Sequence, residues 1–136
     1  MSMTDNVGPL LLYVEDERMI LELGVTSFED SGFAVAGFRS GSEAITALDE
    51  RGADFRALIT DIDLGSGPNG WEVAKYARER HPEMPVVYVS GASANEWPSL
   101  GVPGSTILVK PYAPVQLVVA VSTAMLGPEA QTNKVG

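Results

Sequence analysis

The sequence contains no cysteine and few basic residues. The absence of cysteine excludes disulfide bonds, thiolate metal sites and a cysteine nucleophile. Nine Lys and Arg residues stand against 18 Asp and Glu residues, which gives a formal net charge of −9. Because binding to phosphate backbones needs clustered basic side chains, this balance argues against DNA or RNA as a direct partner.

Long hydrophobic runs are also missing. No apolar stretch reaches the roughly 20 residues that span a bilayer, and residues 1–8 lack the apolar core of a signal peptide. We therefore expect a cytoplasmic protein without membrane segments. The 136 residues, 45% of them hydrophobic, suit one folded domain. We expect that domain at residues 9–127, with a disordered segment at 1–8 and a frayed tail at 128–136.

Short apolar runs alternate with helical patterns along the chain, which is typical of βαβ units and of a parallel sheet. Ser42 is a candidate N-cap of the second helix, and Gly127 is placed to end the last helix. The pattern therefore predicts an α/β fold. Strands are expected at 10–14, 33–38, 57–60, 86–89 and 107–109, and helices at 17–31, 40–50, 71–80, within 94–103 and at 114–126.

Polar or charged side chains stand at the C-terminal ends of four of these strands. Glu15 and Asp16 follow the first strand, Asp61 the third, Ser90 the fourth and Lys110 the fifth. In an open parallel sheet, this edge is where ligands bind. Taken singly, each carboxylate also fits a solvated loop residue or a helix N-cap. The joint pattern predicts three carboxylates, a hydroxyl and an ammonium group gathered at one edge.

These groups suit a divalent cation and a phosphoryl group. Mg²⁺ prefers oxygen ligands and usually takes one or two carboxylates together with waters and phosphate oxygens. Asp16 and Asp61 can supply those carboxylates, and Glu15 can act through a bound water. A carboxylate can attack phosphorus to form an aspartyl phosphate. Lys110 would pair with the phosphoryl oxygens, and Ser90 would donate a hydrogen bond to one of them.

On these residues, and on Gly70 at the start of the third helix, the chain resembles the receiver domain of two-component response regulators over residues 9–126. The resemblance implies a doubly wound, flavodoxin-like parallel sheet of five strands in the order 2-1-3-4-5. It also implies phosphotransfer onto the aspartate from a phosphohistidine of a sensor histidine kinase or a histidine phosphotransfer protein. We expect a stand-alone receiver that signals by protein contact and is not an enzyme beyond its own phosphorylation and dephosphorylation.

The same resemblance implies a role for each carboxylate. Asp61 is the phosphoacceptor, and Asp16 is a direct ligand of Mg²⁺ or Mn²⁺ together with Asp61. Glu15 holds a metal-bound water, and the backbone carbonyl of Asp63 is the third protein ligand. The metal site is thus expected to combine side-chain and main-chain oxygens.

Two further family features and three departures concern signalling. Ser90 corresponds to the switch hydroxyl, and the Lys110–Pro111 peptide is expected to be cis. Glu15 replaces the usual aspartate, and the loop at 64–70 is one residue longer than usual. Ile107 stands where the family usually has Tyr or Phe. Because Ile107 cannot present a ring, signalling is expected to rely on loop and helix movement.

The last helix lacks charge altogether, since residues 113–127 contain no Asp, Glu, Lys or Arg. A helix that covers one face of a sheet needs only one apolar stripe. The first helix also carries two apolar sets, one with Leu23 and the other with Phe28. One interpretation is that extra apolar residues are tolerated on the surface. The other is a contact surface for a partner or for a second copy in a homodimer, with either Val118 or Val119 facing outward.

Two alternatives to a working receiver remain at this point. Asp61-Ile62-Asp63 matches the Asp-x-Asp nucleophile motif of small phosphohydrolases of the haloacid dehalogenase type. In that family the acidic metal pair follows the lysine, whereas Glu15 and Asp16 come first here, and the chain has no cap domain. The second alternative is a degenerate receiver that serves only as an interaction module, which the departures at Glu15 and Ile107 would favour.

Overall fold

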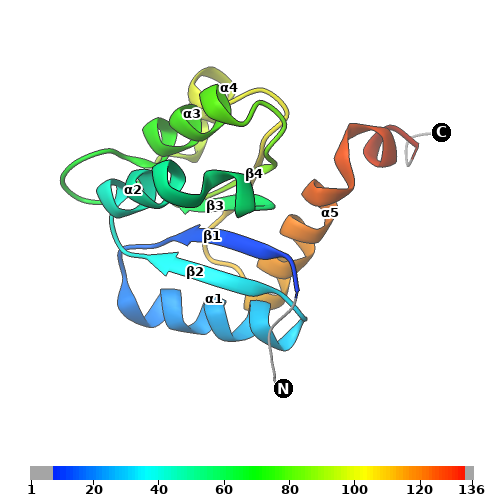
Figure 1. Cartoon of the computed structure of the whole chain (residues 1–136), viewed down its shortest axis with the longest axis horizontal. Helices are drawn as coiled ribbons and strands as arrows, with labels where there is room; N and C mark the ends of the chain where they lie inside the picture. Colours follow the sequence, from blue (N-terminus) through cyan, green and yellow to red (C-terminus); the bar gives the residue numbers. More distant parts are fainter. Residues whose placement is uncertain (1–7, 134–136) are drawn as a thin grey trace.

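The chain folds into three layers around one parallel sheet (Figure 1). This computed structural model describes residues 8–133, with side chains through Gly127. The strand order is β2-β1-β3-β4-β5, and every neighbouring pair is parallel, which confirms the predicted fold class and strand order. The strands are β1 (Leu10–Val14), β2 (Ala34–Phe38), β3 (Ala57–Asp61), β4 (Val86–Ser90) and β5 (Thr106–Val109). The helices are α1 (Arg18–Asp30), α2 (Gly41–Arg51), α3 (Gly70–Arg80), α4 (Trp97–Leu100) and α5 (Pro114–Asn133), with 3₁₀ turns η1 (Gly52–Asp54) and η2 (Ala94–Glu96).

Helices cover both faces of the sheet. α1 and α5 pack on one face, and α2, α3 and α4 pack on the other (Figure 1). Side chains of β1 alternate between the two cores: Leu11 and Tyr13 face α1 and α5, whereas Leu12 and Val14 face α2 and α3. β3 and β4 are buried at every position. A sheet buried on both faces needs continuous apolar runs, and the sequence contains such runs.

Local hydrogen bonds fix where two helices begin. Ser40 caps α2, since its Oγ accepts from the backbone N–H of Glu43 at 3.2 Å. The prediction of Ser42 as the cap was wrong, because Ser40 is the residue with the extended backbone (φ −142°, ψ 156°) that an N-cap requires. α3 begins with a capping box, in which Asn69 and Glu72 each accept a hydrogen bond from the other's backbone N–H.

The apolar helix α5 is interrupted near its C-terminal end. Gly127 has φ 86° and ψ 173°, so the regular helix stops there, as predicted. A further helical segment follows through Asn133, where the sequence analysis placed a tail. The remainder of that tail, 134–136, and residues 1–7 of the expected N-terminal segment lie outside the described residues. Within residues 8–133, none of the helices combines the length and apolarity required to cross a bilayer.

Candidate phosphoacceptor and metal site

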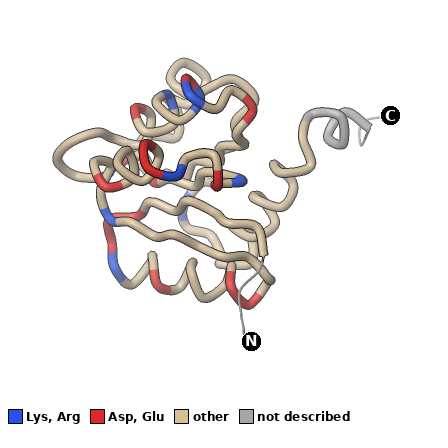
Figure 2. Tube along the Cα trace, in the orientation of Figure 1, with Lys and Arg blue, Asp and Glu red and all other residues tan. Residues whose placement is uncertain are grey.

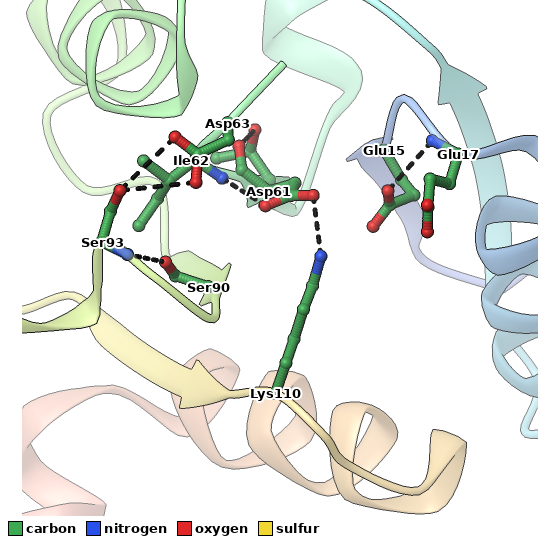
Figure 3. A network of polar contacts seen from close by, with 9 residues as sticks. Glu15, Glu17, Asp61, Ile62, Asp63, Ser90, Ser93 and Lys110 are labelled. Atoms are coloured by element: carbon green, nitrogen blue, oxygen red, sulfur yellow. Dashed lines mark hydrogen bonds and ion pairs between the residues drawn. The ribbon is translucent and has the colours of Figure 1, made fainter. Parts of the chain in front are cut away.

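The predicted site residues meet at the C-terminal edge of the sheet. β1, β3, β4 and β5 end there, and Lys110 extends from the end of β5 toward Asp61 (Figure 3). An open cleft of about 280 Å³ lies at this edge. Its walls include the predicted residues Asp16, Asp61, Asp63 and Lys110, and also Glu17, Gly91 and Ala92. The parallel topology therefore brings together groups up to 94 positions apart, from Asp16 to Lys110.

Three carboxylates form a tight cluster in the cleft. Ligand oxygens of Glu15, Asp16 and Asp61 all lie within 4.8 Å of one another. Asp61 is only 4% exposed and Glu15 only 1%. Burial raises the pKa of Glu15 to about 7, with the charge of Asp61 adding to the shift and a hydrogen bond from the Glu17 N–H opposing it. The donors are all oxygens whose charges repel, which is the donor set that a hard divalent cation fits.

Asp61 is held at both oxygens. Its Oδ1 accepts from the backbone N–H of Ile62 at 2.7 Å, and its Oδ2 accepts from Lys110 Nζ at 3.0 Å (Figure 3). Burial alone would lower the pKa of Lys110, but the hydrogen bond and charge of Asp61 outweigh burial and raise it. Lys110 therefore places a charged ammonium group against the Oδ2 oxygen of Asp61. The peptide between Lys110 and Pro111 is cis, as the resemblance implied.

Ser90 lies fully buried at the end of β4, and a neighbouring serine orients it. Ser90 Oγ accepts from the backbone N–H of Ser93 at 3.1 Å, and this use of its lone pair leaves the O–H group to donate elsewhere. Ser93 Oγ in turn donates to the Asp63 carboxylate at 3.4 Å (Figure 3). Neither Ser93 nor Glu17 was predicted from the sequence to belong to the site. Their roles depend on tertiary contacts and on the turn after β1, which spacing along the chain does not show.

Ile107 is half-buried and packs into the core beneath α3 and α4. On the same face, the hydroxyl of Tyr88 accepts from the backbone N–H of Val102 at 3.0 Å, and Trp97 Nε1 donates to Ser105 Oγ at 3.0 Å. These contacts tie the segment around α4 to the sheet. Position 107 has an isoleucine and not the aromatic residue usual in the family. No ring can therefore move there between Ser90 and the segment around α4.

The fold and the four strand-end groups together match one known family. A family model described as the response regulator receiver domain matches residues 11–122. The chain belongs to this family. This match rules against a phosphohydrolase of the haloacid dehalogenase type. The Asp61-Ile62-Asp63 sequence therefore lies in a receiver domain and is not that family's nucleophile motif. The match leaves the degenerate receiver as the remaining alternative.

Known receivers resemble the chain in both sequence and structure. A response regulator receiver protein from Sinorhizobium medicae superposes with a TM-score of 0.85 at 40% identity, covering 89% of this chain and 97% of that chain. A receiver domain protein from Clostridium thermocellum gives a TM-score of 0.78 at 22% identity, covering 85% and 93%, and supports the fold alone. Response regulator SaeR of Staphylococcus aureus is 26% identical over 117 residues. That match takes in 85% of this receiver but only 50% of SaeR, so the chain spans about half the length of the curated relatives it matches.

Proposed function

We propose that this receiver accepts a phosphoryl group on Asp61 from a phosphohistidine of a sensor histidine kinase or a histidine phosphotransfer protein. One observation carries the proposal: a buried aspartate lies within a three-carboxylate cluster, and an ammonium group is 3.0 Å from its Oδ2 oxygen. An oxygen of Asp61 forms a bond to phosphorus while the phosphorus–nitrogen bond breaks. The imidazole nitrogen keeps the electron pair of that bond and takes up a proton. The receiver's chemistry is limited to this reaction and to hydrolysis of the aspartyl phosphate.

The carboxylate cluster supports a requirement for Mg²⁺ or Mn²⁺. Asp16 and Asp61 would be carboxylate ligands, the backbone carbonyl of Asp63 a third ligand, and Glu15 a holder of a bound water. When bound, the cation neutralises charge on the phosphoryl oxygens. Without a cation, the clustered negative charge of the cleft opposes the approach of a phosphoryl dianion. The chain's own contribution is to gather the oxygens and to hold Asp61 in place.

Lys110 and Ser90 are placed to bind the oxygens of the incoming phosphoryl group. Lys110 Nζ already touches the acceptor oxygen, so a short movement carries its charge to a phosphoryl oxygen. Ser90 is anchored through Ser93 and has its O–H group available to donate. Charge-assisted hydrogen bonds of this kind are stronger than neutral ones. The two residues would therefore hold the phosphorylated state and move when it forms.

Phosphorylation of Asp61 can be tested with a small donor. We expect acetyl phosphate to add one phosphoryl group in the presence of Mg²⁺ and none in EDTA, as read by intact-protein mass spectrometry. Asp61→Asn should abolish incorporation. Asp30→Asn is a matched control, because Asp30 is an exposed aspartate at the C-terminal end of α1 and does not line the cleft. Incorporation in Asp61→Asn equal to that of the unaltered protein would reject Asp61 and favour the degenerate receiver.

We further propose that α1 and α5 form the surface through which the signal passes to a partner or to a second copy. The two helices pack against each other, and α5 carries no charge through Gly127 (Figure 2). Exposed apolar side chains on this surface are Met19 (75% exposed), Leu23 (59%), Val115 (65%) and Val119 (58%). Val118 packs inward against the core, so Val119 is the valine that faces outward. A contiguous exposed apolar surface on a soluble domain marks an interaction site.

Introducing a charge on this surface tests whether α5 is a contact surface or an apolar helix without a partner. Val119→Glu should weaken self-association or phosphotransfer from a kinase, because a carboxylate in an apolar contact is costly to desolvate. Leu100→Glu on α4 is the matched control, since it places the same charge at an exposed leucine on the other side of the sheet. Light scattering across a concentration series and phosphotransfer assays measure the two effects. Equal behaviour of both variants, with the fold intact, would leave α5 as an apolar helix without a partner.

A further inference from the structure

Two buried tyrosine hydroxyls lack a hydrogen bond in the described part of the chain, those of Tyr13 and Tyr112. The two groups lie close together and already interact, since a hydrogen-bonding contact between them raises the pKa of Tyr13 and lowers that of Tyr112, yet the full geometry of a hydrogen bond is not met. Burial raises the pKa of both phenols, so both are neutral and each can donate or accept. A buried polar group without a partner is costly, and a bond between these two would relieve both at once.

Each tyrosine is joined by a short stretch of backbone to a group of the phosphoacceptor site. Tyr13 lies in β1 two residues before Glu15, and Tyr112 lies two residues after Lys110. Lys110 is bonded to Asp61 at 3.0 Å. A movement of the backbone at Lys110 would therefore reach Tyr112 across two peptide units, and both residues line one cavity.

Tyr13 is also in direct contact with α1. Its ring meets that of Phe28 edge to face, at 5.7 Å between centroids. The helix backbone approaches so closely at Gly24 that an added Cβ would lie 2.6 Å from the Tyr13 hydroxyl oxygen. Glycine in the middle of a helix is otherwise unfavourable. A shift of the Tyr13 ring must therefore be accommodated by α1.

A cavity beside the two tyrosines gives their rings room to move. It measures about 310 Å³ and lies between α1 and the start of α5. Both tyrosines and Lys110 line it, as do Gly24 of α1 and Leu117 of α5. We call it the tyrosine cavity. Close packing normally prevents a buried ring from changing position, and a neighbouring cavity removes that obstacle.

We infer that Tyr13 and Tyr112 close a hydrogen bond when Asp61 is phosphorylated, and that this pair links the phosphoacceptor site to the packing of α1 against α5. The inference rests on the proposed phosphorylation of Asp61. When Lys110 leaves the Asp61 oxygen for a phosphoryl oxygen, the segment that carries Tyr112 moves with it. The two hydroxyls break no bond to another group and complete the one between them. Tyr13 then transmits the change to α1 at Gly24, on the face opposite the one where Ile107 lies.

The absence of cysteine allows this coupling to be measured directly. Thr26→Cys on α1 and Ser122→Cys on α5 are exposed positions that can carry a pair of nitroxide labels in the full chain. Electron paramagnetic resonance then gives the α1–α5 distance distribution. The distribution is recorded with Mg²⁺ alone and with Mg²⁺ plus beryllofluoride, which stands in for the phosphoryl group. Incorporation of phosphate from acetyl phosphate is measured in parallel.

We expect beryllofluoride to shift the distance distribution in the labelled protein. Tyr112→Phe and Tyr13→Phe keep the rings but remove the hydroxyls, so each should abolish the shift while phosphate incorporation at Asp61 is unchanged. The double variant should behave as each single variant does, because the two hydroxyls act as a pair. Tyr88→Phe is the matched control: its hydroxyl is buried but bonded to Val102 on the other face, and the shift should persist.

The possible failures are distinguishable. A full shift in Tyr112→Phe, or a shift lost equally in Tyr88→Phe, would overturn the inference. So would impaired incorporation in Tyr112→Phe, which would place Tyr112 in the phosphoacceptor site itself. A phosphorylated protein that shows no shift would overturn the inference and leave the proposed function standing. No incorporation in the unaltered protein would overturn the proposed function, and the inference with it.

Discussion

The acidic cleft at the sheet edge and the tyrosine cavity share Lys110 as a common wall, but their polar groups differ in hydrogen bonding. At the cleft, Asp61 and Lys110 in its wall and the buried Ser90 next to it each have a hydrogen-bond partner. In the tyrosine cavity, two hydroxyls are buried without one. Hydrogen-bonded groups hold a fixed geometry, whereas unpartnered groups beside free volume can adopt a second arrangement. The cleft is therefore held in one arrangement by its hydrogen bonds, whereas the two tyrosines are free of such bonds.

Metal removal should show how strongly the cleft depends on a cation. Mg²⁺ that binds only the folded state adds about 2.7 kcal/mol of stability at 100 times its Kd. We therefore expect the melting temperature to rise with Mg²⁺ and to fall again with EDTA. In Asp16→Asn the rise should be much smaller, because one carboxylate ligand is lost. An undiminished response in that variant would exclude Asp16 as a ligand, while Asp30→Asn, outside the cleft, should respond as the unaltered protein does.

One pH dependence of stability should come from Glu15. Burial raises the pKa of Glu15 from 4.5 to about 7, so in the absence of metal the folded state favours its protonated form. The stability gained from this protonation is present below 4.5 and is lost as the pH rises through about 7. Urea unfolding in EDTA at a series of pH values measures this loss. Glu15→Gln should flatten the profile between those two values, and a profile unchanged by that substitution would contradict the assignment to Glu15.

The smallest expected effect is on the free energy of unfolding when tyrosine hydroxyls of the tyrosine cavity are removed. Tyr13→Phe and Tyr112→Phe remove hydroxyls that have no partner, so the free energy of unfolding should stay the same or rise slightly. Tyr88→Phe breaks the bond to Val102 and should lower it by about 1 kcal/mol. Denaturant titration of the three variants distinguishes them. Equal destabilisation in all three would show that the Tyr13 and Tyr112 hydroxyls are bonded in solution.

The fold and the assembly of the cleft could be predicted from the sequence because both follow from strand positions. Apolar runs mark the strands, and in a parallel sheet the residue after each strand is carried to the same edge. The positions of Asp61, Ser90 and Lys110 at this edge could therefore be predicted without any knowledge of side-chain contacts. The error at Ser42 was of a different kind, since two serines near one helix start differ only in backbone conformation.

The tyrosine pair could not be predicted, because its significance lies in what is missing around it. Tyr13 and Tyr112 look in sequence like ordinary aromatic core residues, and only the folded structure shows that their hydroxyls have no partner. Gly24 looks like a weak point in a helix until the Tyr13 hydroxyl is placed against it. The residue on the outward face of α5 could not be predicted either. Where every residue of a helix is uncharged and most are apolar, periodicity contains no contrast between Val118 and Val119.

The charge-free stretch of α5 has a consequence for how salt acts on this receiver. The protein as a whole carries a net charge of −9, so two copies, or a copy and another acidic protein, repel each other at a distance. The α5 surface itself contributes no charge to that repulsion, and its attraction is apolar and insensitive to screening. Dissolved ions shorten the repulsion to about 8 Å at physiological ionic strength. Ionic strength should therefore strengthen a contact made by α5, the reverse of its effect on an interface built from ion pairs.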